Sequence, residues 1–153
     1  MTAQVRDVLK YNGEKLYMAA EPLKDYLKKI KLPHKLVAPH TACWRGYDAK
    51  WAINNKKLFL TDWKGYILDY QEVGIDYLFP GEEFVFADWF TGIVRVPIGD
   101  EITYVHSGYG SVYEGDMFLE FKDGVLVNEH SKWLTKEEIE KIKAESKMLD
   151  DLF

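Results

Sequence analysis

The chain has 153 residues, of which 47% are hydrophobic and 29% charged, and its formal net charge at pH 7 is −5. This length suits one domain that buries about two thirds of the surface its unfolded form exposes, so neither a disulfide nor a metal is required for folding. The acidic balance argues against nucleic-acid binding and against docking on anionic membranes, because both need clustered cations.

Membrane insertion and secretion find no support in the sequence. No apolar run approaches the ~18 residues of a membrane span. Residues 1–7 contain no apolar signal segment. Cys43 is the single cysteine, which excludes an internal disulfide and fits a reducing compartment. We therefore expect a cytoplasmic protein.

The N-terminal third predicts a hairpin and then a helix. The hairpin covers residues 5–18, because Asn12-Gly13 is a strong signal for a two-residue turn in which both residues tolerate positive φ. The helix covers residues 22–31, with Pro22 suited to its start. Its apolar positions follow the spacing of one helix face: Leu23, Tyr26, Leu27 and Ile30.

From Leu36 onward the pattern is typical of β-structure. Asn54-Asn55 and Asp123-Gly124 are expected to be hairpin turns. The run 84–90 carries apolar residues at both strand parities, which predicts a central strand that is covered on two faces. The predicted strands are 40–47, 49–53, 57–62, 65–71, 83–90, 92–97, 101–106, 116–121 and 125–130.

The last predicted element is an amphipathic helix over residues 135–153. Thr135 is a suitable N-cap, and Glu138 completes a capping box three residues later. We therefore expect a single domain, 1–153, with a β-rich body over residues 5–134. The fold class is mainly β (α+β): an antiparallel β-sandwich or partly closed barrel of about eight or nine strands, with a short N-terminal helix and this C-terminal helix.

Metal and thiol chemistry have weak signals. His40 and Cys43 have H-x-x-C spacing, but the remaining histidines are scattered and do not complete a zinc ligand set. We expect neither a metal nor a cofactor. Cys43 is interpreted as a buried small hydrophobe, and the alternative is a nucleophile paired with a histidine. The glycine-containing run 106–111 is interpreted as a tight loop, because no helix follows it to form a phosphate site.

Asp88 stands inside the apolar run 84–90, so we expect its carboxylate to be paired with a cation or to have a raised pKa. The preferred interpretation is a buried ion pair with Arg45 or Arg95. The alternative is general acid/base catalysis with Glu114 or His106 as partner. Both interpretations place Asp88 in the protein interior or in a cleft.

Aromatic residues make up 15% of the chain, and many lie beside charges. Core packing accounts best for Trp44, Trp51 and Trp89, whereas tyrosines near the glycine-containing run could line a binding surface. One such surface is expected to contain Arg45, Tyr47, Asp88, Trp89, Arg95, His106, Tyr109 and Tyr113.

We find no motif that identifies a family, so two functional hypotheses remain. The first is a non-enzymatic protein that binds a small molecule or inhibits a basic protein, as a bacterial immunity protein does. The second is a small enzyme that uses Asp88, Glu114 and His106 for proton transfer, or Cys43 as nucleophile.

Overall fold

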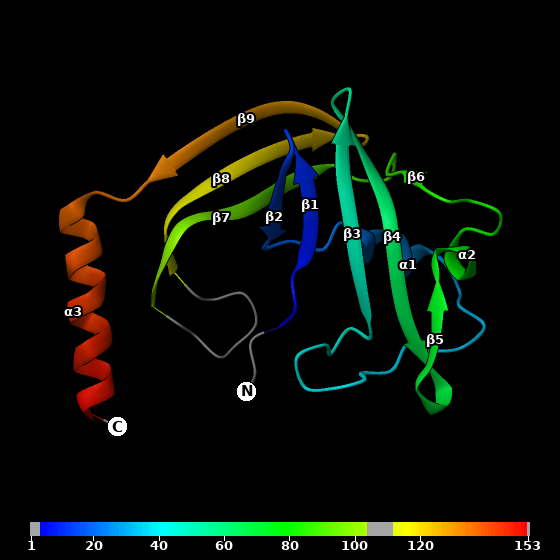
Figure 1. The fold of residues 1–153 in the computed structure, drawn as a ribbon, viewed down its shortest axis with the longest axis horizontal. Coiled ribbons are helices and arrows are strands. Elements are labelled where there is room, and N and C mark those ends of the chain that lie inside the picture. Colours follow the sequence, from blue (N-terminus) through cyan, green and yellow to red (C-terminus); the bar gives the residue numbers. More distant parts are fainter. Residues whose placement is uncertain (1–3, 104–111, 153) are drawn as a thin grey trace.

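The computed structural model describes residues 4–103 and 112–152. Within them the chain forms nine strands and three helices, together with one 3-10 turn, η1 (Leu68–Tyr70) (Figure 1). The helices are α1 (Leu23–Lys29), α2 (Ile75–Leu78) and α3 (Lys136–Leu152). The strands are β1 (Asp7–Tyr11), β2 (Glu14–Met18), β3 (Tyr47–Asn54), β4 (Lys57–Ile67), β5 (Gln71–Gly74), β6 (Val85–Phe86), β7 (Gly92–Thr103), β8 (Val112–Lys122) and β9 (Val125–Trp133).

The strands form one curled sheet in the order β2-β1-β3-β4-β9-β8-β7, and β5 and β6 pair with the remaining edge of β4. All pairs are antiparallel except β1 and β3, which run parallel. The first and last strands of this order, β2 and β7, approach each other. The N–H of Ala19, the residue after β2, donates to the carbonyl of Arg95 in β7 at 2.8 Å. The sheet is nevertheless not closed into a barrel. The predicted mainly β, α+β class is confirmed.

The junction between β4 and β9 divides the sheet into two halves. Only Lys57 and Val125 pair there, after which β9 follows β8 away from β4 (Figure 1). Each half turns an apolar face inward, following the period-two alternation of strands. The large side chains that fill the space between the halves include Leu9, Trp51, Leu60, Trp63, Val94, Leu119 and Phe121.

The predicted hairpin turns are confirmed at Asn12-Gly13 and at Asp123-Gly124, where both residues have positive φ. The turn between β3 and β4 lies one residue later than predicted, at Asn55-Lys56. Asn54 instead pairs with Lys57 as the last residue of β3. The helix predicted over 22–31 is α1, which is shorter by a few residues.

The strand predicted over 40–47 is wrong. The Cys43 N–H donates to the His40 carbonyl at 3.1 Å, and the Gly46 N–H donates to the Cys43 carbonyl at 3.3 Å. These two turns reverse the chain before β3 begins. Gly46 has φ of +80° and no room for a Cβ beside the Val37 carbonyl, so glycine is required at this close approach. Trp44, predicted to be core, lies in this turn and is 47% exposed.

The strand predicted over 83–90 is also wrong, because only Val85 and Phe86 pair with β4. The Phe90 N–H then donates to the Ala87 carbonyl at 3.1 Å, which bends the chain into a turn. This turn brings Ala87 and Phe90 into the core together, although they have opposite strand parity, and leaves Phe84 59% exposed. The apolar run therefore reflects a turn that packs on the core and not a doubly covered strand.

Two further pairs of predicted strands are single, longer strands. The predicted strands 57–62 and 65–71 are β4, which continues through Gly65. Glycine is needed at this position because the Trp63 ring occupies the space that a Cβ would need. The predicted strands 92–97 and 101–106 are β7 up to Thr103, with an irregularity after Ile98 where Gly99 has φ of +79°.

The C-terminal helix is confirmed together with its capping box. The Glu138 N–H donates to Thr135 Oγ1 at 3.1 Å, and the Thr135 N–H donates to Glu138 Oε1 at 3.3 Å. Helix α3 stands at one side of the sheet and contacts β7 (Figure 1). None of the helices in residues 4–103 and 112–152 combines the length and apolar character that crossing a membrane requires.

Candidate functional site

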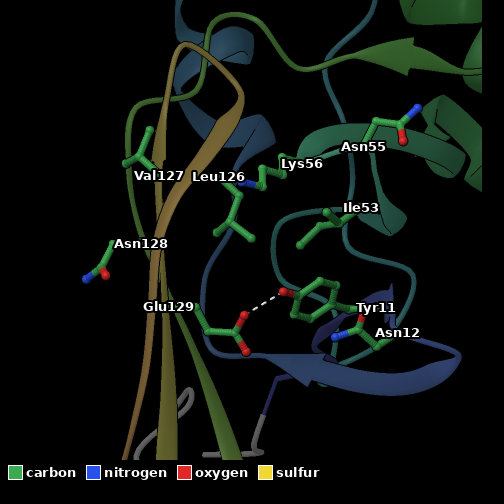
Figure 2. A pocket seen from close by; sticks show the side chains of 9 residues that line it. All are labelled: Tyr11, Asn12, Ile53, Asn55, Lys56, Leu126, Val127, Asn128 and Glu129. Atoms are coloured by element: carbon green, nitrogen blue, oxygen red, sulfur yellow. Dashed lines mark hydrogen bonds between the residues drawn. The ribbon is translucent and has the colours of Figure 1, made fainter.

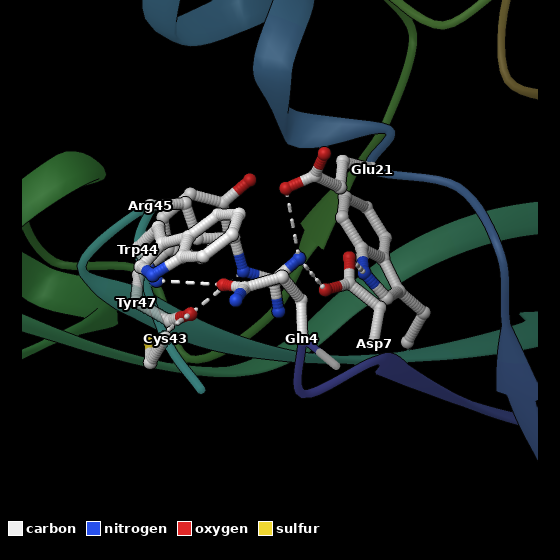
Figure 3. Close-up of polar contacts among 8 residues, drawn as sticks. Gln4, Asp7, Glu21, Cys43, Trp44, Arg45 and Tyr47 are labelled. Carbon is white, nitrogen blue, oxygen red and sulfur yellow. Dashed lines mark hydrogen bonds and ion pairs between the residues drawn. The ribbon is translucent and has the colours of Figure 1, made fainter. Parts of the chain in front are cut away.

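Arg45 is the centre of a partly buried polar cluster in front of β3 (Figure 3). Its Nη1 lies 2.5 Å from Asp7 Oδ1 and 3.2 Å from Glu21 Oε1. Its Nε donates to the Tyr47 carbonyl at 2.8 Å, and its guanidinium stacks 4.4 Å from the centre of the Tyr47 ring. The side chain of Arg45 is 13% exposed. We call Asp7, Glu21, Arg45, Tyr47 and Trp51 the Arg45 cluster.

Asp7 is the fully buried member of this cluster. Trp51 Nε1 donates to Asp7 Oδ2 at 2.8 Å. Burial raises the pKa of Asp7 to about 6, and this effect outweighs the opposing attraction of Arg45. Asp7 shares the inward strand parity of Leu9. This alternation is the sequence signal that could have identified Asp7 as a buried carboxylate in need of a cation.

The arrangement of the Arg45 cluster favours a structural role. One guanidinium is balanced by two carboxylates, and it also contacts an aromatic face and a carbonyl. Outside it lies an open depression of about 400 Å³, lined in part by Lys24 and Lys28 of α1. The cluster thus joins the start of β1, the segment before α1 and the start of β3 through one ion network.

Cys43 belongs to the turn that precedes this network. It is buried, and its S–H donates to the Tyr47 carbonyl at 3.4 Å. Burial raises the pKa of the thiol, and the charge of Asp48 raises it further. Since the thiolate is the nucleophilic form, this setting favours the predicted role of a small buried hydrophobe.

Asp88 does not form the predicted buried ion pair. It is exposed in the turn after β6. The arginines expected to neutralise it have other partners, because Arg45 pairs with Asp7 and Arg95 pairs with Asp116 at 2.8 Å. The prediction failed because it assumed a continuous strand through residue 88, whereas the turn there directs the side chain to solvent.

The other predicted site residues are held in separate interactions. Trp89 Nε1 donates to the Pro22 carbonyl at 2.9 Å, and its ring packs among core aromatics, including Trp51. Tyr113 donates to Glu101 at 3.1 Å. Glu114 accepts a hydrogen bond from the Asp100 N–H at 2.6 Å.

His106 and Tyr109, the remaining predicted site residues, lie outside the described residues. Of the predicted set, the structure thus brings together Arg45, Tyr47 and Cys43. Within the described ranges, no three His, Cys, Asp or Glu side chains cluster in a way that could hold a metal ion.

A groove at the end of the curled sheet was missed from the sequence (Figure 2). It has a volume of about 370 Å³ and lies between β9 and the tips of the β1–β2 and β3–β4 hairpins. Tyr11 donates to Glu129 across it, with an oxygen–oxygen distance of 2.5 Å. These residues are 118 positions apart in the chain, so local patterns could not have joined them.

The charges of the protein are unevenly distributed along the chain. Residues 65–94, which we call the acidic segment, contain six carboxylates and no lysine, arginine or histidine, whereas the other 123 residues contain 19 acidic and 20 basic side chains. The segment runs from the end of β4 through β5, α2 and β6 to the start of β7, and its strands β5 and β6 pair with the edge of β4 that faces away from β3. All six carboxylates are exposed: Asp69, Glu72, Asp76, Glu82, Glu83 and Asp88.

Comparisons with known proteins give no assignment. No family model, curated protein or solved structure matches the chain. A function must therefore be inferred from the geometry and charge of the molecule itself.

Proposed function

We propose that this chain is a non-enzymatic binding protein that recognises a basic protein through its acidic segment. The observation that carries this proposal is the charge distribution. The acidic segment has a net charge of −6, while the rest of the chain has a net charge of +1. Within the described residues Glu72 pairs with Lys64 at 3.5 Å, and the other five carboxylates of the segment form no ion pair. A basic partner would therefore be attracted to this edge of the sheet, which accelerates and orients encounter.

Exposed apolar side chains in the same segment supply contact area for such a partner. Leu68 is 67% exposed, Tyr70 66% and Phe84 59%. Asp69 and Tyr70 have φ of 60° and 57°, a left-handed conformation that costs a residue with a Cβ about 1–2 kcal/mol. Leu68 and Tyr70 are thus exposed on a turn whose backbone strain would be absent from a turn with only negative φ angles.

A small protein that neutralises a basic toxin, as an immunity protein does, is one form this function would take. Its binding would weaken as salt rises, because exposed charges are screened beyond roughly 8 Å at physiological ionic strength. Tyr70, which lies between Asp69 and Glu72 in the sequence, is suited to a partner surface that combines lysine or arginine with an apolar pocket.

Affinity capture with a charge-matched control tests the proposal. The test variant carries Asp69→Lys, Glu72→Lys and Asp76→Lys, and the control carries Glu137→Lys, Glu140→Lys and Glu145→Lys on exposed positions of α3. Both variants change the net charge from −5 to +1. We expect wild type and control to retain a basic protein from native extract, identified by mass spectrometry, and the test variant to lose it.

Calorimetry with the purified partner gives the quantitative measure. We expect at least a tenfold weaker Kd for the test variant and less than a threefold change for the control. Equal weakening in both variants would show that total charge and not the acidic segment governs binding. Recovery of acidic partners alone would contradict the proposal.

A further inference from the structure

The outward face of the sheet over β2, β1, β3 and the first half of β4 is rich in lysine. These four strands are consecutive in the sheet (Figure 1). Leu9, Trp51 and Leu60 point into the core, so the alternate positions of their strands point outward. Four exposed lysines and two aromatic residues occupy such outward positions. We call these residues the lysine face: Lys10, Lys15, Tyr17, Lys50, Lys57 and Phe59.

Within the described residues, the lysines of this face are not paired with carboxylates. None of the four takes part in an ion pair. Asp62 is the register partner of Lys50, yet these two side chains form no ion pair either, and Asp48 lies outward two residues before Lys50. The lysine face therefore combines four positive charges with two bordering carboxylates, in a protein whose net charge is −5.

Lys10 and Lys15 are placed at a cost to stability. They lie directly opposite each other in the antiparallel pair of β1 and β2. Like charges at such positions destabilise a sheet. Protection against edge-to-edge association accounts for lysines on edge strands only. Lys50 and Lys57 belong to β3 and β4, which lie inside the sheet order, so protection of an edge does not account for them. A bound anion with several charges would account for all four lysines.

The positions of the lysines favour an extended anion. Neighbouring strands lie about 4.8 Å apart, so β2 and β4 are separated by roughly 14 Å. A single phosphate or carboxylate that contacts Lys10 and Lys15 therefore cannot also reach Lys57. The six positions of the lysine face include no arginine, the residue whose planar fork matches a carboxylate, whereas lysine binds phosphate as a point charge. A chain of phosphate groups fits this composition better than a chain of carboxylates.

Tyr17 and Phe59 add flat surfaces to the same face. Tyr17 is 51% exposed, and the Lys15 ammonium lies 5.7 Å from the centre of its ring. Phe59 is half-buried, and its ring centre lies 5.8 Å from that of Phe86 in β6. Aromatic side chains on a sheet stack on the bases of single-stranded nucleic acids, while nearby cations bind the backbone. A duplex presents its bases in grooves that admit a helix or a two-stranded ribbon, so a four-stranded face cannot read them.

We propose that the lysine face binds single-stranded nucleic acid. The four lysines neutralise backbone phosphates, and the two rings stack on bases without selecting a sequence. The acidic segment pairs with the other edge of β4, so its carboxylates repel a nucleic-acid strand that extends past β4. The expectation against nucleic acid used the total charge, which does not describe a single face. The lysine face and the acidic segment share no residue, and this proposal does not rest on recognition of a basic protein.

Fluorescence anisotropy with labelled oligonucleotides tests the proposal. The probes are oligothymidylate and oligouridylate of about 12 nucleotides. A DNA duplex, a polyglutamate peptide and phosphatidylserine vesicles are added as competitors. We expect binding to at least one single strand and weak competition from all three. The plot of log K against log salt should have a slope of about −2 to −3, since three or four phosphates are neutralised. Absence of binding to both strands, or a competitor that binds more tightly than either, would overturn the proposal.

Two charge-matched double variants locate the site. Lys10→Gln with Lys50→Gln removes two charges of the lysine face, whereas Lys141→Gln with Lys143→Gln removes two exposed charges of α3. Each double variant changes the net charge from −5 to −7. The first should weaken the Kd at least about tenfold and make the salt slope shallower by about 1.4. The second should leave the Kd within about twofold. Equal weakening in both would show that total charge governs binding and would refute this site.

Variants of Tyr17 measure the contribution of stacking. Tyr17→Ala should weaken the Kd about fivefold or more without changing the salt slope, whereas Tyr17→Phe keeps the ring and should bind as the wild type does. Lys10→Gln alone should keep or raise the melting temperature, because it removes the repulsion from Lys15. Its loss of affinity is then not a consequence of unfolding. Binding that survives both Tyr17→Ala and the double variant of Lys10 and Lys50 would place the site elsewhere and refute the lysine face.

Discussion

Arg45 Nη1 lies 2.5 Å from the carboxylate of Asp7, a residue with no exposed surface. This ion pair connects β1 to the turn before β3, the strand that runs parallel to β1. Removal of two charges from water costs several kcal/mol per ion, and their attraction compensates only when the geometry is good and the other polar atoms are satisfied. The Trp51 indole, the Tyr47 carbonyl and Glu21 supply three further contacts to this pair. The cluster is therefore sensitive to loss of any one partner.

The raised pKa of Asp7 predicts a stability that depends on pH. The pKa is about 6 in the folded protein, against 3.8 for an ordinary aspartate, so the folded state holds this proton more tightly than the unfolded chain does. The corresponding stabilisation is complete below about pH 3.8 and is lost as pH rises through about 6. The full difference amounts to up to about 3 kcal/mol.

Urea denaturation from pH 4 to pH 7 on wild type and Asp7→Asn measures this effect. The asparagine cannot titrate, so the free energy of unfolding of wild type minus that of the variant should fall across this range. A difference that stays constant, or that grows with pH, would show that Asp7 has an ordinary or lowered pKa in the folded protein.

Replacement of Arg45 should destabilise the protein strongly. Arg45→Met leaves the buried Asp7 carboxylate without its cation, which typically costs about 3–5 kcal/mol. Arg45→Lys should recover only part of this loss, because an ammonium cannot reproduce the Nε contact to the Tyr47 carbonyl and the flat stacking on the ring.

Arg95 offers a matched control on a second strand. Its ion pair with Asp116 is 33% exposed on each side, so Arg95→Met should cost about 1 kcal/mol or less. Both substitutions are measured by chemical denaturation at pH 7. Similar losses for the two arginines would mean that the Arg45 cluster is no more important to stability than a partly exposed pair.

The accuracy of the sequence predictions follows the range of the interactions involved. The hairpin at Asn12-Gly13 and the capping box of Thr135 and Glu138 depend on neighbours within a few residues, and both are confirmed. The partner of Arg45 was assigned wrongly because Asp7 is 38 positions away and is brought near by parallel pairing of β1 with β3. The alternation of apolar and polar residues along a strand does not reveal which strand pairs with it, so the Asp7–Arg45 ion pair could not be deduced from the sequence around either residue.

Turns that pack on the core caused the other errors. The apolar residues around Asp88 satisfied a strand pattern, yet the chain turns there and places Ala87 and Phe90 on the same side. The groove was missed for a related reason, because its lining comes from three separate hairpin regions.

The capping box of α3 predicts a local change in stability. Thr135→Ala removes the acceptor for the Glu138 N–H, which should destabilise the helix by about 1 kcal/mol. Amide hydrogen exchange in the first turn of α3 should accelerate roughly fivefold, the factor that this free energy represents. Thr135→Ser keeps the hydroxyl and should restore slow exchange. Acceleration of equal size in β3 would indicate global rather than local destabilisation.

Two glycines at equivalent turn positions should respond very differently to alanine. Gly13 and Gly124 have φ of +76° and +79°, so each substitution incurs the same backbone cost of about 1–2 kcal/mol. A Cβ at Gly13 would meet nothing within 4 Å, whereas a Cβ at Gly124 would clash with the Ala87 carbonyl oxygen. The clash involves backbone on both sides, and the Gly124 carbonyl also accepts a hydrogen bond from the Leu58 N–H at 2.9 Å.

Gly124→Ala should therefore lose about 3 kcal/mol or more, the range expected when strain is added to a tightly packed contact. Gly13→Ala should lose only the backbone term. If the two variants have equal m-values, the difference between their urea midpoints measures the loss of stability that comes from the steric clash. The cost of the left-handed backbone is the same in both variants and cancels. Losses within about 0.5 kcal/mol of each other, the scatter of ordinary surface substitutions, would show that the turn after β6 can move away from Gly124, and that the packing of this turn against the β8–β9 hairpin is loose.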